Sequence, residues 1–454
     1  MQEQQKLGFS GSMMQAFTSV GPMLDIVAVF SVIAIYSGIM LPIVMALSFI
    51  VGFTTINTVY RFSRIFVSNG GYYTYIGKSI GKLPAIFIGL LYLMYASLVL
   101  PNISLFVSGF VAASLSIAFR VPLLLELVVS LIFPVIIVFF VTRGLKLTVK
   151  YTVIAGFLEL IMVVVASLMF FIHRAVGLSL YNGFNFNINA VFLGVVFGIL
   201  VFSGSGSSIF LSDNVTDAKR TIPRSILASY TISGILMIIS SMALVLFLGK
   251  TGVSAYTVNP YVLLSMVYNK FGLLFYTVFI FFSVLSSANL TVSYTNALRN
   301  SFQRMLLEKV FWSKPVKINT PNYLMVAVAL LSVLTGVIAF IYNDYFYIFA
   351  ILAGVVSLSY MTIHIITNIA LMKFRPGNSL FSVLVPPAIS TILLSATFYY
   401  SAFATGSGLF ISNLIFASLI FVSIVLALFI RLKGSHFAMI NIDAEETGNN
   451  SKIQ

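Results

Sequence analysis

The sequence predicts an all-α integral membrane protein with about 12 transmembrane helices, and three observations carry this prediction. The chain has 454 residues, of which 60% are hydrophobic and only 8% are charged. A water-soluble domain of this size would expose one large apolar surface, so the bilayer is the expected solvent. A spanning helix needs roughly 20 apolar residues, and the chain offers about twelve such runs. Two of these runs are interrupted at matching places.

The two interruptions lie in the first and sixth apolar runs. Ser19-Val20-Gly21-Pro22 breaks the first run, and Ser203-Gly204-Ser205-Gly206-Ser207-Ser208 breaks the sixth. Proline lacks an N–H group, and glycine holds a helix poorly. Backbone groups freed in hydrocarbon are costly unless they line a polar cavity or are buried in protein. Matching breaks in two halves therefore indicate an inverted-repeat secondary transporter with a binding site at the bilayer midplane.

Each span is read from an apolar run bounded by loop residues. We expect spans at 13–38, 41–62, 84–116, 122–142, 147–172, 190–212, 223–249, 271–298, 322–342, 345–372, 380–402 and 408–431. Spans 1–5 (13–172) and spans 6–10 (190–372) form two repeats, and 380–431 holds two peripheral spans. Segment 69–82 suits a short helix at the inner membrane surface, and segment 250–270 suits a small outer lid helix.

Basic residues alternate between the two sides of the membrane. With the N-terminus placed inside, 21 of the 25 Lys and Arg residues fall on the inner side and 4 on the outer side. This positive-inside bias predicts a multi-pass protein of the cytoplasmic membrane with both termini, 1–12 and 432–454, in the cytoplasm. The polar tail 441–454 is expected to be disordered.

Composition and motifs exclude several other classes. The net charge of +14 does not form a single stripe, so we expect no nucleic-acid partner. The chain has no cysteine and three histidines, which excludes disulfides and zinc–thiolate sites. We find no P-loop, zinc helix or serine-hydrolase elbow. We therefore expect a transporter and not an enzyme, with no cofactor and no bound metal, driven by an ion gradient or by the gradient of its substrate.

Asp25 stands inside the first span, just after the break. A carboxylate at this depth costs at least ~2.5–3.5 kcal/mol on insertion scales, so it needs a partner or a function. Asp25 either contacts the ammonium group of a substrate or a coupling cation, or it caps the second half of the broken helix. The helix half that follows the second break would present N–H groups to a carboxylate, although small residues also serve tight helix packing.

Three further residues are candidates for ion coupling. Glu159 lies mid-span, where a carboxyl group can hold a proton near neutral pH, so it is either a proton carrier or a structural acid that faces another helix. Ser286 and Ser287 in the eighth span could complete a sodium site with carbonyls of the first break, or could simply join helices. The sequence favours the proton over sodium. Tyr92 and Tyr95 share a face and either line the path or pack, and His364 is read as a packing residue.

Three stretches resemble the APC superfamily, the amino acid–polyamine–organocation transporters. They are Gly21-Pro22 with the helix that follows, the segment from Arg61-Phe62-Ser63-Arg64 to Asn69-Gly70-Gly71-Tyr72-Tyr73-Thr74-Tyr75, and the sixth-span break with its turn Asp217-Ala218-Lys219-Arg220-Thr221-Ile222-Pro223-Arg224. The resemblance implies the five-plus-five inverted repeat of the leucine-transporter type, with helices 1 and 6 broken. It also implies that amino acids or related amines are the substrates.

The resemblance places a substrate between the two breaks. The amino group would meet backbone carbonyls near Gly21–Leu24, and the carboxylate would meet N–H groups near Gly204–Ser207. The predicted substrate-binding set is Gly21, Pro22, Met23, Leu24, Asp25, Phe202, Ser203, Gly204, Ser205, Gly206 and Ser207, with Glu159, Ser286 and Ser287 for coupling.

The chain departs from the family pattern at several positions. Gly206 stands where many members carry an acid, Glu159 stands where some proton-coupled members carry a lysine, and Asp25 stands where we expect a small or apolar residue. Asp25 favours a substrate with an amine or cationic side chain. The leading interpretation is an amino acid permease that works by symport or exchange. An amine or polyamine transporter, an uncoupled exchanger, and a membrane sensor or channel remain alternatives.

Overall fold

A computed structural model describes residues 6–117, 122, 124–177, 187–311, 320–375, 380–403 and 407–432. These residues form helices, apart from turns, a few irregular residues and one isolated bridge between Leu7 and Val215. The first span consists of α1 (Phe9–Thr18), α2 (Pro22–Leu24), a π-helical turn (Asp25–Val29) and α3 (Phe30–Ser37). The predicted tail and His436 lie outside the described residues.

The remaining helices follow the predicted spans closely. They are α4 (Leu41–Ser63), α5 (Tyr72–Ile80), α6 (Lys82–Ser116), α7 (Leu124–Thr142), α8 (Leu145–Ile172), α9 (Ile188–Val201), the 3₁₀ segment η4 (Ser203–Asn214), α10 (Ala218–Val258), α11 (Val262–Leu307), α12 (Thr320–Tyr342), α13 (Tyr345–Phe374), α14 (Leu380–Ala402) and α15 (Ser407–Leu432). The surface helix predicted at 69–82 is α5.

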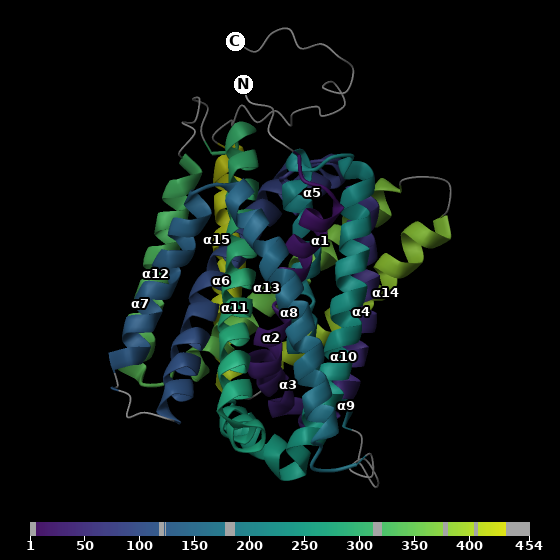
Figure 1. Cartoon of the computed structure of the whole chain (residues 1–454). Helices are drawn as coiled ribbons and strands as arrows, with labels where there is room; N and C mark the ends of the chain where they lie inside the picture. The colour runs from purple at the N-terminus through teal and green to yellow at the C-terminus, as the bar shows by residue number, and fades with distance from the viewer. Residues whose placement is uncertain are drawn as a thin grey trace.

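The connection predicted as an outer lid is helical on both sides of Asn259. Gly249 in α10 and Gly272 in α11 have non-helical backbone angles, with φ of 65° and 76°, so each long helix bends there. Residues 250–258 and 262–271 therefore form two short helical pieces between the bends. In Figure 1 this connection lies at the end of the molecule opposite α5.

Eleven helical segments among the described residues are long and apolar enough to cross a membrane. The first of them, Val29–Ser63, joins the end of the first broken span to α4. The broken first span and α4 are therefore two crossings, which accounts for the twelve expected from the sequence. Large apolar side chains such as Ile132, Phe139, Ile161 and Leu168 are exposed, as expected where lipid is the solvent.

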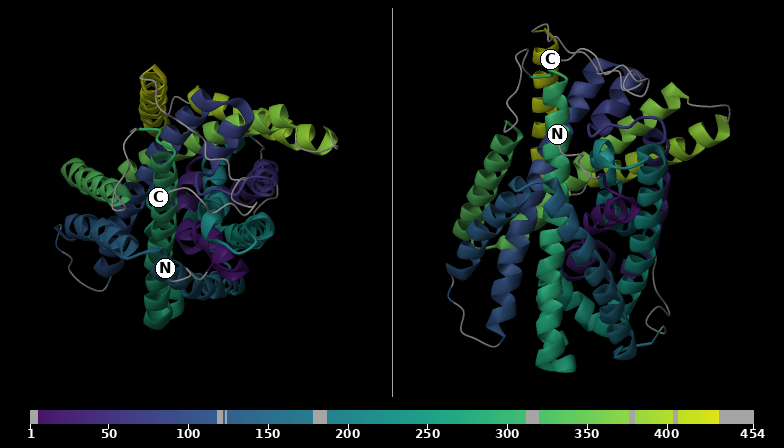
Figure 2. Two further views of the ribbon diagram at one scale, coloured as in Figure 1. Left: turned by 90° about the horizontal axis from the view of Figure 1, so that it is seen from above. Right: turned by 45° about the horizontal axis from the view of Figure 1, so that its top comes forward.

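Most of the spanning helices fall into two groups, and α8 and α13 each pack on members of both. The first comprises α1, α3, α4, α9 and α10, which pack on one another around the two breaks. The second comprises α6, α7, α11 and α12, which also pack mutually. The peripheral helices α14 and α15 pack against α13, and α15 also contacts α6. Figure 2 shows both helices at the edge of the molecule in the view from above. This leaves the two breaks near the centre (Figure 1).

Candidate functional site

The first break is a turn built by two residues. Gly21 has φ 73° and ψ 55°, a left-handed conformation that glycine adopts without strain. Pro22 then opens α2 at the position where a missing N–H group costs nothing. A side chain on Gly21 would also meet Leu290, since an added Cβ would lie 2.7 Å from Leu290 Cδ1. This turn separates the carbonyls of α1 from the N–H groups of α2.

The second break lies directly against the first. A Cβ atom on Gly204 would lie 1.9 Å from the carbonyl oxygen of Ser19, so only glycine permits this approach. Ser207 stabilises this contact between the breaks. Its Oγ lies 2.6 Å from Ser19 Oγ and donates to the Gln15 carbonyl at 3.3 Å. Beyond the break the chain continues as a 3₁₀ helix, and not as the α-helical half that the sequence led us to expect.

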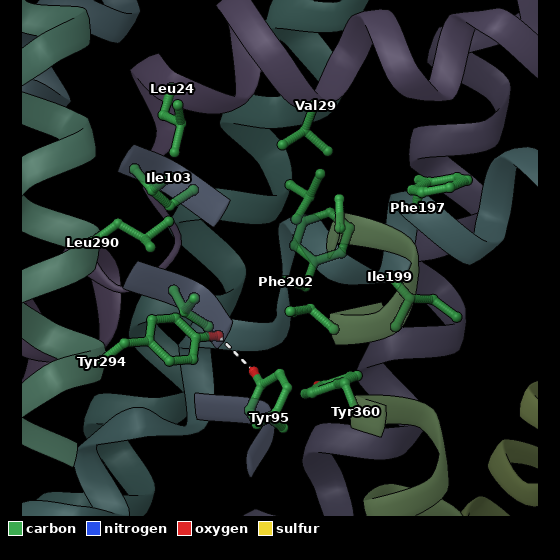
Figure 3. Packing of buried hydrophobic residues seen from close by; sticks show 14 of the residues in the cluster. Leu24, Val29, Tyr95, Ile103, Phe197, Ile199, Phe202, Leu290, Tyr294 and Tyr360 are labelled. Atoms are coloured by element: carbon green, nitrogen blue, oxygen red, sulfur yellow. Dashed lines mark hydrogen bonds between the residues drawn. The ribbon is translucent and has the colours of Figure 1, made fainter. Parts of the chain in front are cut away.

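A cavity lies between the breaks and the surrounding helices. Its volume is about 40 Å³. Leu24, Val29, Val99, Ile103 and Leu290 supply apolar walls, and Leu200, Phe349 and Val356 extend them. Figure 3 shows Leu24, Ile103 and Leu290 close to one another, on elements far apart in the sequence. The polar lining residues are Ser19, Asp25, Asn102, Ser203 and Tyr294.

Asp25 is the acidic residue of this cavity. Its side chain is buried, and its Oδ2 atom has no hydrogen-bond partner among the described residues. The backbone N–H of Asp25 donates to the Gly21 carbonyl at 2.9 Å. Because an unpartnered buried carboxyl oxygen is costly, it is the kind of group that a ligand completes.

Glu159 and Ser286, not Asp25, satisfy the N–H groups that open α2. Glu159 Oε1 accepts from the Met23 N–H at 3.4 Å and from Ser286 Oγ at 2.5 Å, and Oε2 accepts from Asn289 Nδ2 at 2.8 Å. The Leu24 N–H donates to Ser286 Oγ at 3.0 Å. An acid near a helix N-terminus is favourable. Glu159 of α8 thus joins the first break to α11.

The structure separates the two serines predicted for coupling. Ser286 belongs to the Glu159 cluster, whereas Ser287 Oγ donates to the Ser283 carbonyl of its own helix. Ser286 Oγ already accepts one N–H and donates to a carboxylate. The described contacts therefore bring Glu159 and Ser286 together with the first break and leave Ser287 outside this cluster.

A second, smaller pocket lies on the other side of a hydroxyl chain. Tyr95 Oη donates to Tyr294 Oη at 3.0 Å, and Tyr294 Oη lies 2.7 Å from Ser203 Oγ. Figure 3 marks the Tyr95–Tyr294 bond. Ser203 and Tyr294 line both pockets, and the smaller one is otherwise lined by aromatic residues and by Ser207 and Ile363. These aromatic residues are Tyr72, Tyr92, Tyr95, Phe210 and Tyr360.

The sequence missed Tyr294 and Asn102 as lining residues. Tyr294 follows a run of small polar residues on α11, and Asn102 follows Pro101 inside α6, so neither stands out as a motif. Asn102 Nδ2 donates to the Phe349 carbonyl at 2.7 Å. His364 Nε2 lies 3.2 Å from Tyr72 Oη, behind the smaller pocket, which agrees with its reading as a packing residue.

Of the predicted substrate-binding set, Leu24, Asp25 and Ser203 line the larger cavity, and Ser207 lines the smaller pocket. Phe202 is buried, and the centroid of its ring lies 5.9 Å from that of Phe49 and 5.5 Å from that of Tyr230. Ser205 is buried, and its hydroxyl has no partner among the described residues. Gly206 is buried near Tyr72, so both residues support the packing of η4.

Polar contacts join the two helix groups at the end where α5 lies. Tyr73 Oη donates to Glu308 Oε2 at 2.7 Å, and Arg304 Nε donates to Glu308 Oε1 at 2.8 Å. Burial and the Glu308 carboxylate raise the pKa of the Tyr73 phenol, so its hydroxyl stays protonated and donates. Asp213 at the end of η4 lies 3.9 Å from Arg304 Nη1. These contacts join α5 and η4 to the end of α11.

Comparison with known proteins assigns the family. The family model described as amino acid permease matches residues 11–436. The chain belongs to this family, which is part of the APC superfamily. The comparison with curated proteins gives no match.

Solved structures of similar fold are also transporters. A manganese transporter from Eremococcus coleocola, solved with an aromatic bis-isothiourea compound, is 13% identical with a TM-score of 0.58, covering 93% of this chain and 94% of that one. A Na⁺-coupled sialic acid symporter in its substrate-bound outward-open state is 11% identical with a TM-score of 0.55, covering 88% and 91%. At these identities the likeness concerns the fold, and it confirms the leucine-transporter type.

Proposed function

We propose that this permease carries amino acids or related amines across the cytoplasmic membrane by alternating access, with both termini in the cytoplasm. The observation that carries the proposal is the cavity between the two helix breaks, with the unpartnered carboxyl oxygen of Asp25 in its wall. A cavity at the meeting point of two broken helices is where transporters of this architecture hold their substrates.

The ammonium group of the substrate would bind Asp25 and the backbone of the first break. Ser19 and Ser203 line the cavity on the sides of the first and second breaks and offer hydroxyl groups. The apolar walls suit an aliphatic or aromatic body. In this proposal α1–α4, α9 and α10 move as one body against α6, α7, α11 and α12, which pack as the other.

A specific observation favours an amine transporter as the second candidate. No Lys or Arg is found among the described residues that line the cavity, so a substrate carboxylate would have only hydroxyl, amide and backbone donors. An amine has no carboxylate group, so it needs no basic partner in the cavity.

Uptake into proteoliposomes tests the proposal. The purified protein would be offered labelled amino acids and their decarboxylated amines, with proton and sodium gradients imposed separately. We expect saturable uptake of at least one amino acid or amine above that of protein-free vesicles. Absence of uptake and exchange for every member of both panels, under both gradients, would contradict the proposal.

A further inference from the structure

We propose that Asp25 holds an exchangeable proton when the cavity is empty, and loses it when the ammonium group of an apolar amine binds, so that one proton is exchanged for one amine cation. This inference rests on the proposed transport function and assigns separate roles to the two buried acids. It moves the proton from Glu159, where the sequence alone placed it, to Asp25.

Hydrogen bonding distinguishes the two acids. Glu159 accepts from three donors, namely the Met23 N–H, Ser286 Oγ and Asn289 Nδ2. Donors that point at a carboxylate favour its ionised form. Asp25 Oδ2 has no such donor among the described residues and is equally buried. An ionised carboxylate without donors is strongly disfavoured away from water, so Asp25 is neutral until a cation arrives.

The groups around Asp25 reinforce this division. Glu159 of α8, Tyr256 of α10 and Tyr294 of α11 are the titratable residues that interact with Asp25 electrostatically. Helix α9, which also packs beside the break, contains no titratable residue. None of these neighbours is basic. Since two neighbouring acids cannot both ionise cheaply, the acid with donors takes the charge and the other keeps the proton.

The lining of the cavity indicates the substrate class. Asn102 Nδ2 already donates a hydrogen bond to the Phe349 carbonyl, and the Ser203 and Tyr294 hydroxyls are hydrogen-bonded to each other. The remaining walls are mostly aliphatic, with Val29, Val99 and Ile103 among them. One acid, no base and apolar walls match a compact amine with one ammonium group and a hydrocarbon body.

The exchange balances in protons and charge. When the amine binds, the O–H bond of Asp25 breaks, the proton passes to water on the open side, and the ammonium group donates to the carboxylate. After the cavity opens to the other side, the amine leaves with its protons and water there supplies a proton to Asp25. One positive charge crosses in each direction, so the cycle is electroneutral.

Calorimetry on the full-length protein in detergent tests the inference directly. The probe is 3-methylbutylamine hydrochloride, which is leucine without its carboxylate and is a cation at neutral pH. Titrations in two buffers of different ionisation enthalpy give the number of protons released for each amine bound. We expect about one proton for the wild type, and a Kd that falls about tenfold for each unit rise in pH, as linkage requires.

Variants locate the proton. Glu159→Gln and the distant control Glu126→Gln should both still release about one proton, and Asp25→Glu should keep the release. Asp25→Asn should weaken amine binding at least ~100-fold, the usual scale for loss of a buried charge partner. Amine binding without proton release in the wild type, or release lost in Glu159→Gln and kept in Asp25→Asn, would overturn the inference.

Binding and uptake of leucine distinguish failure of this inference from failure of the proposed transport function. If leucine binds and is taken up but the amine does neither, the inference on substrate class fails while the transport function stands. If neither compound nor any member of the uptake panels is bound or transported, both fail.

Discussion

Replacement of Gly204 by alanine should greatly slow transport while leaving the protein folded. The added Cβ would lie 1.9 Å from the carbonyl oxygen of Ser19 and 2.1 Å from its carbonyl carbon. The closest common carbon–oxygen contacts are about 3.3 Å, so the two breaks must move apart by about 1.4 Å. Both obstructing atoms belong to the backbone, so no side chain can turn away to relieve the contact.

A shift of this size separates Ser19 from Ser207, whose hydroxyl oxygens lie 2.6 Å apart and join the two breaks. Misplacement of a bound group by about 1 Å can cost roughly 100-fold in rate, and we expect a loss of that order in the initial rate of uptake. Two glycines provide controls. A Cβ on Gly11 would meet Val149 Cγ1 at 3.5 Å, an ordinary contact, and one on Gly206 would meet the movable Tyr72 hydroxyl at 3.3 Å.

Uptake by proteoliposomes and the melting temperature of the purified protein would be measured for Gly204→Ala, Gly11→Ala and Gly206→Ala. We expect normal folding in all three variants and a large loss of uptake in Gly204→Ala alone. Wild-type uptake by Gly204→Ala would refute the reasoning, because the two breaks could then separate without consequence.

Three further predictions concern the acids and the contacts at the α5 end. Asp25→Asn should raise the Kd for substrate at least ~100-fold and Glu126→Gln should not, because Glu126 lies near the start of α7, away from the cavity; equal, wild-type affinities would remove Asp25 from the site. Glu159→Gln should lower the free energy of unfolding by about 1–3 kcal/mol. If the Gln oxygen accepts from Met23 and Ser286, its amide N–H groups face the Asn289 Nδ2 donor, and neither donor has an acceptor there. A melting temperature that is unchanged, and equal to that of the control Ser287→Ala, would argue against the capping role of Glu159. Tyr73→Phe removes the bond to Glu308 and should favour opening at the α5 end by about 1 kcal/mol, or roughly fivefold. Tyr75→Phe is its matched control, since the Tyr75 hydroxyl is buried on the same helix without a partner among the described residues; hydrogen exchange at α5 that is the same in both variants would contradict the prediction.

The sequence was sufficient for the spans and for the positions of the two breaks. Apolar runs of membrane length and the Gly21-Pro22 pair are local signals, and the helices begin and end close to the expected residues. The substrate set was less accessible, because burial depends on which helices meet. Phe202 belongs to the second break, yet its ring packs against Phe49 and Tyr230.

Long-range contacts bear on alternatives that the sequence leaves open. Asp25 was read either as a ligand for substrate or as a helix cap, and Glu159 either as a proton carrier or as a structural acid. Glu159 and Ser286 take the N–H groups of Met23 and Leu24 through contacts more than 100 positions apart in the chain. No spacing rule reveals such pairs. Tyr294 and Asn102 enter the cavity for the same reason, because helix packing turns them toward it.

The central claim is that substrate passes through the cavity between the two breaks. The absence of native cysteine allows a direct test with Ser203→Cys, which places one thiol in the wall of that cavity. Uptake by proteoliposomes would be measured before and after treatment with a small methanethiosulfonate reagent, with and without substrate present during the treatment. We expect the reagent to stop uptake, and we expect substrate to slow the reaction of the thiol. Full uptake by protein whose Ser203→Cys thiol has reacted completely would contradict it.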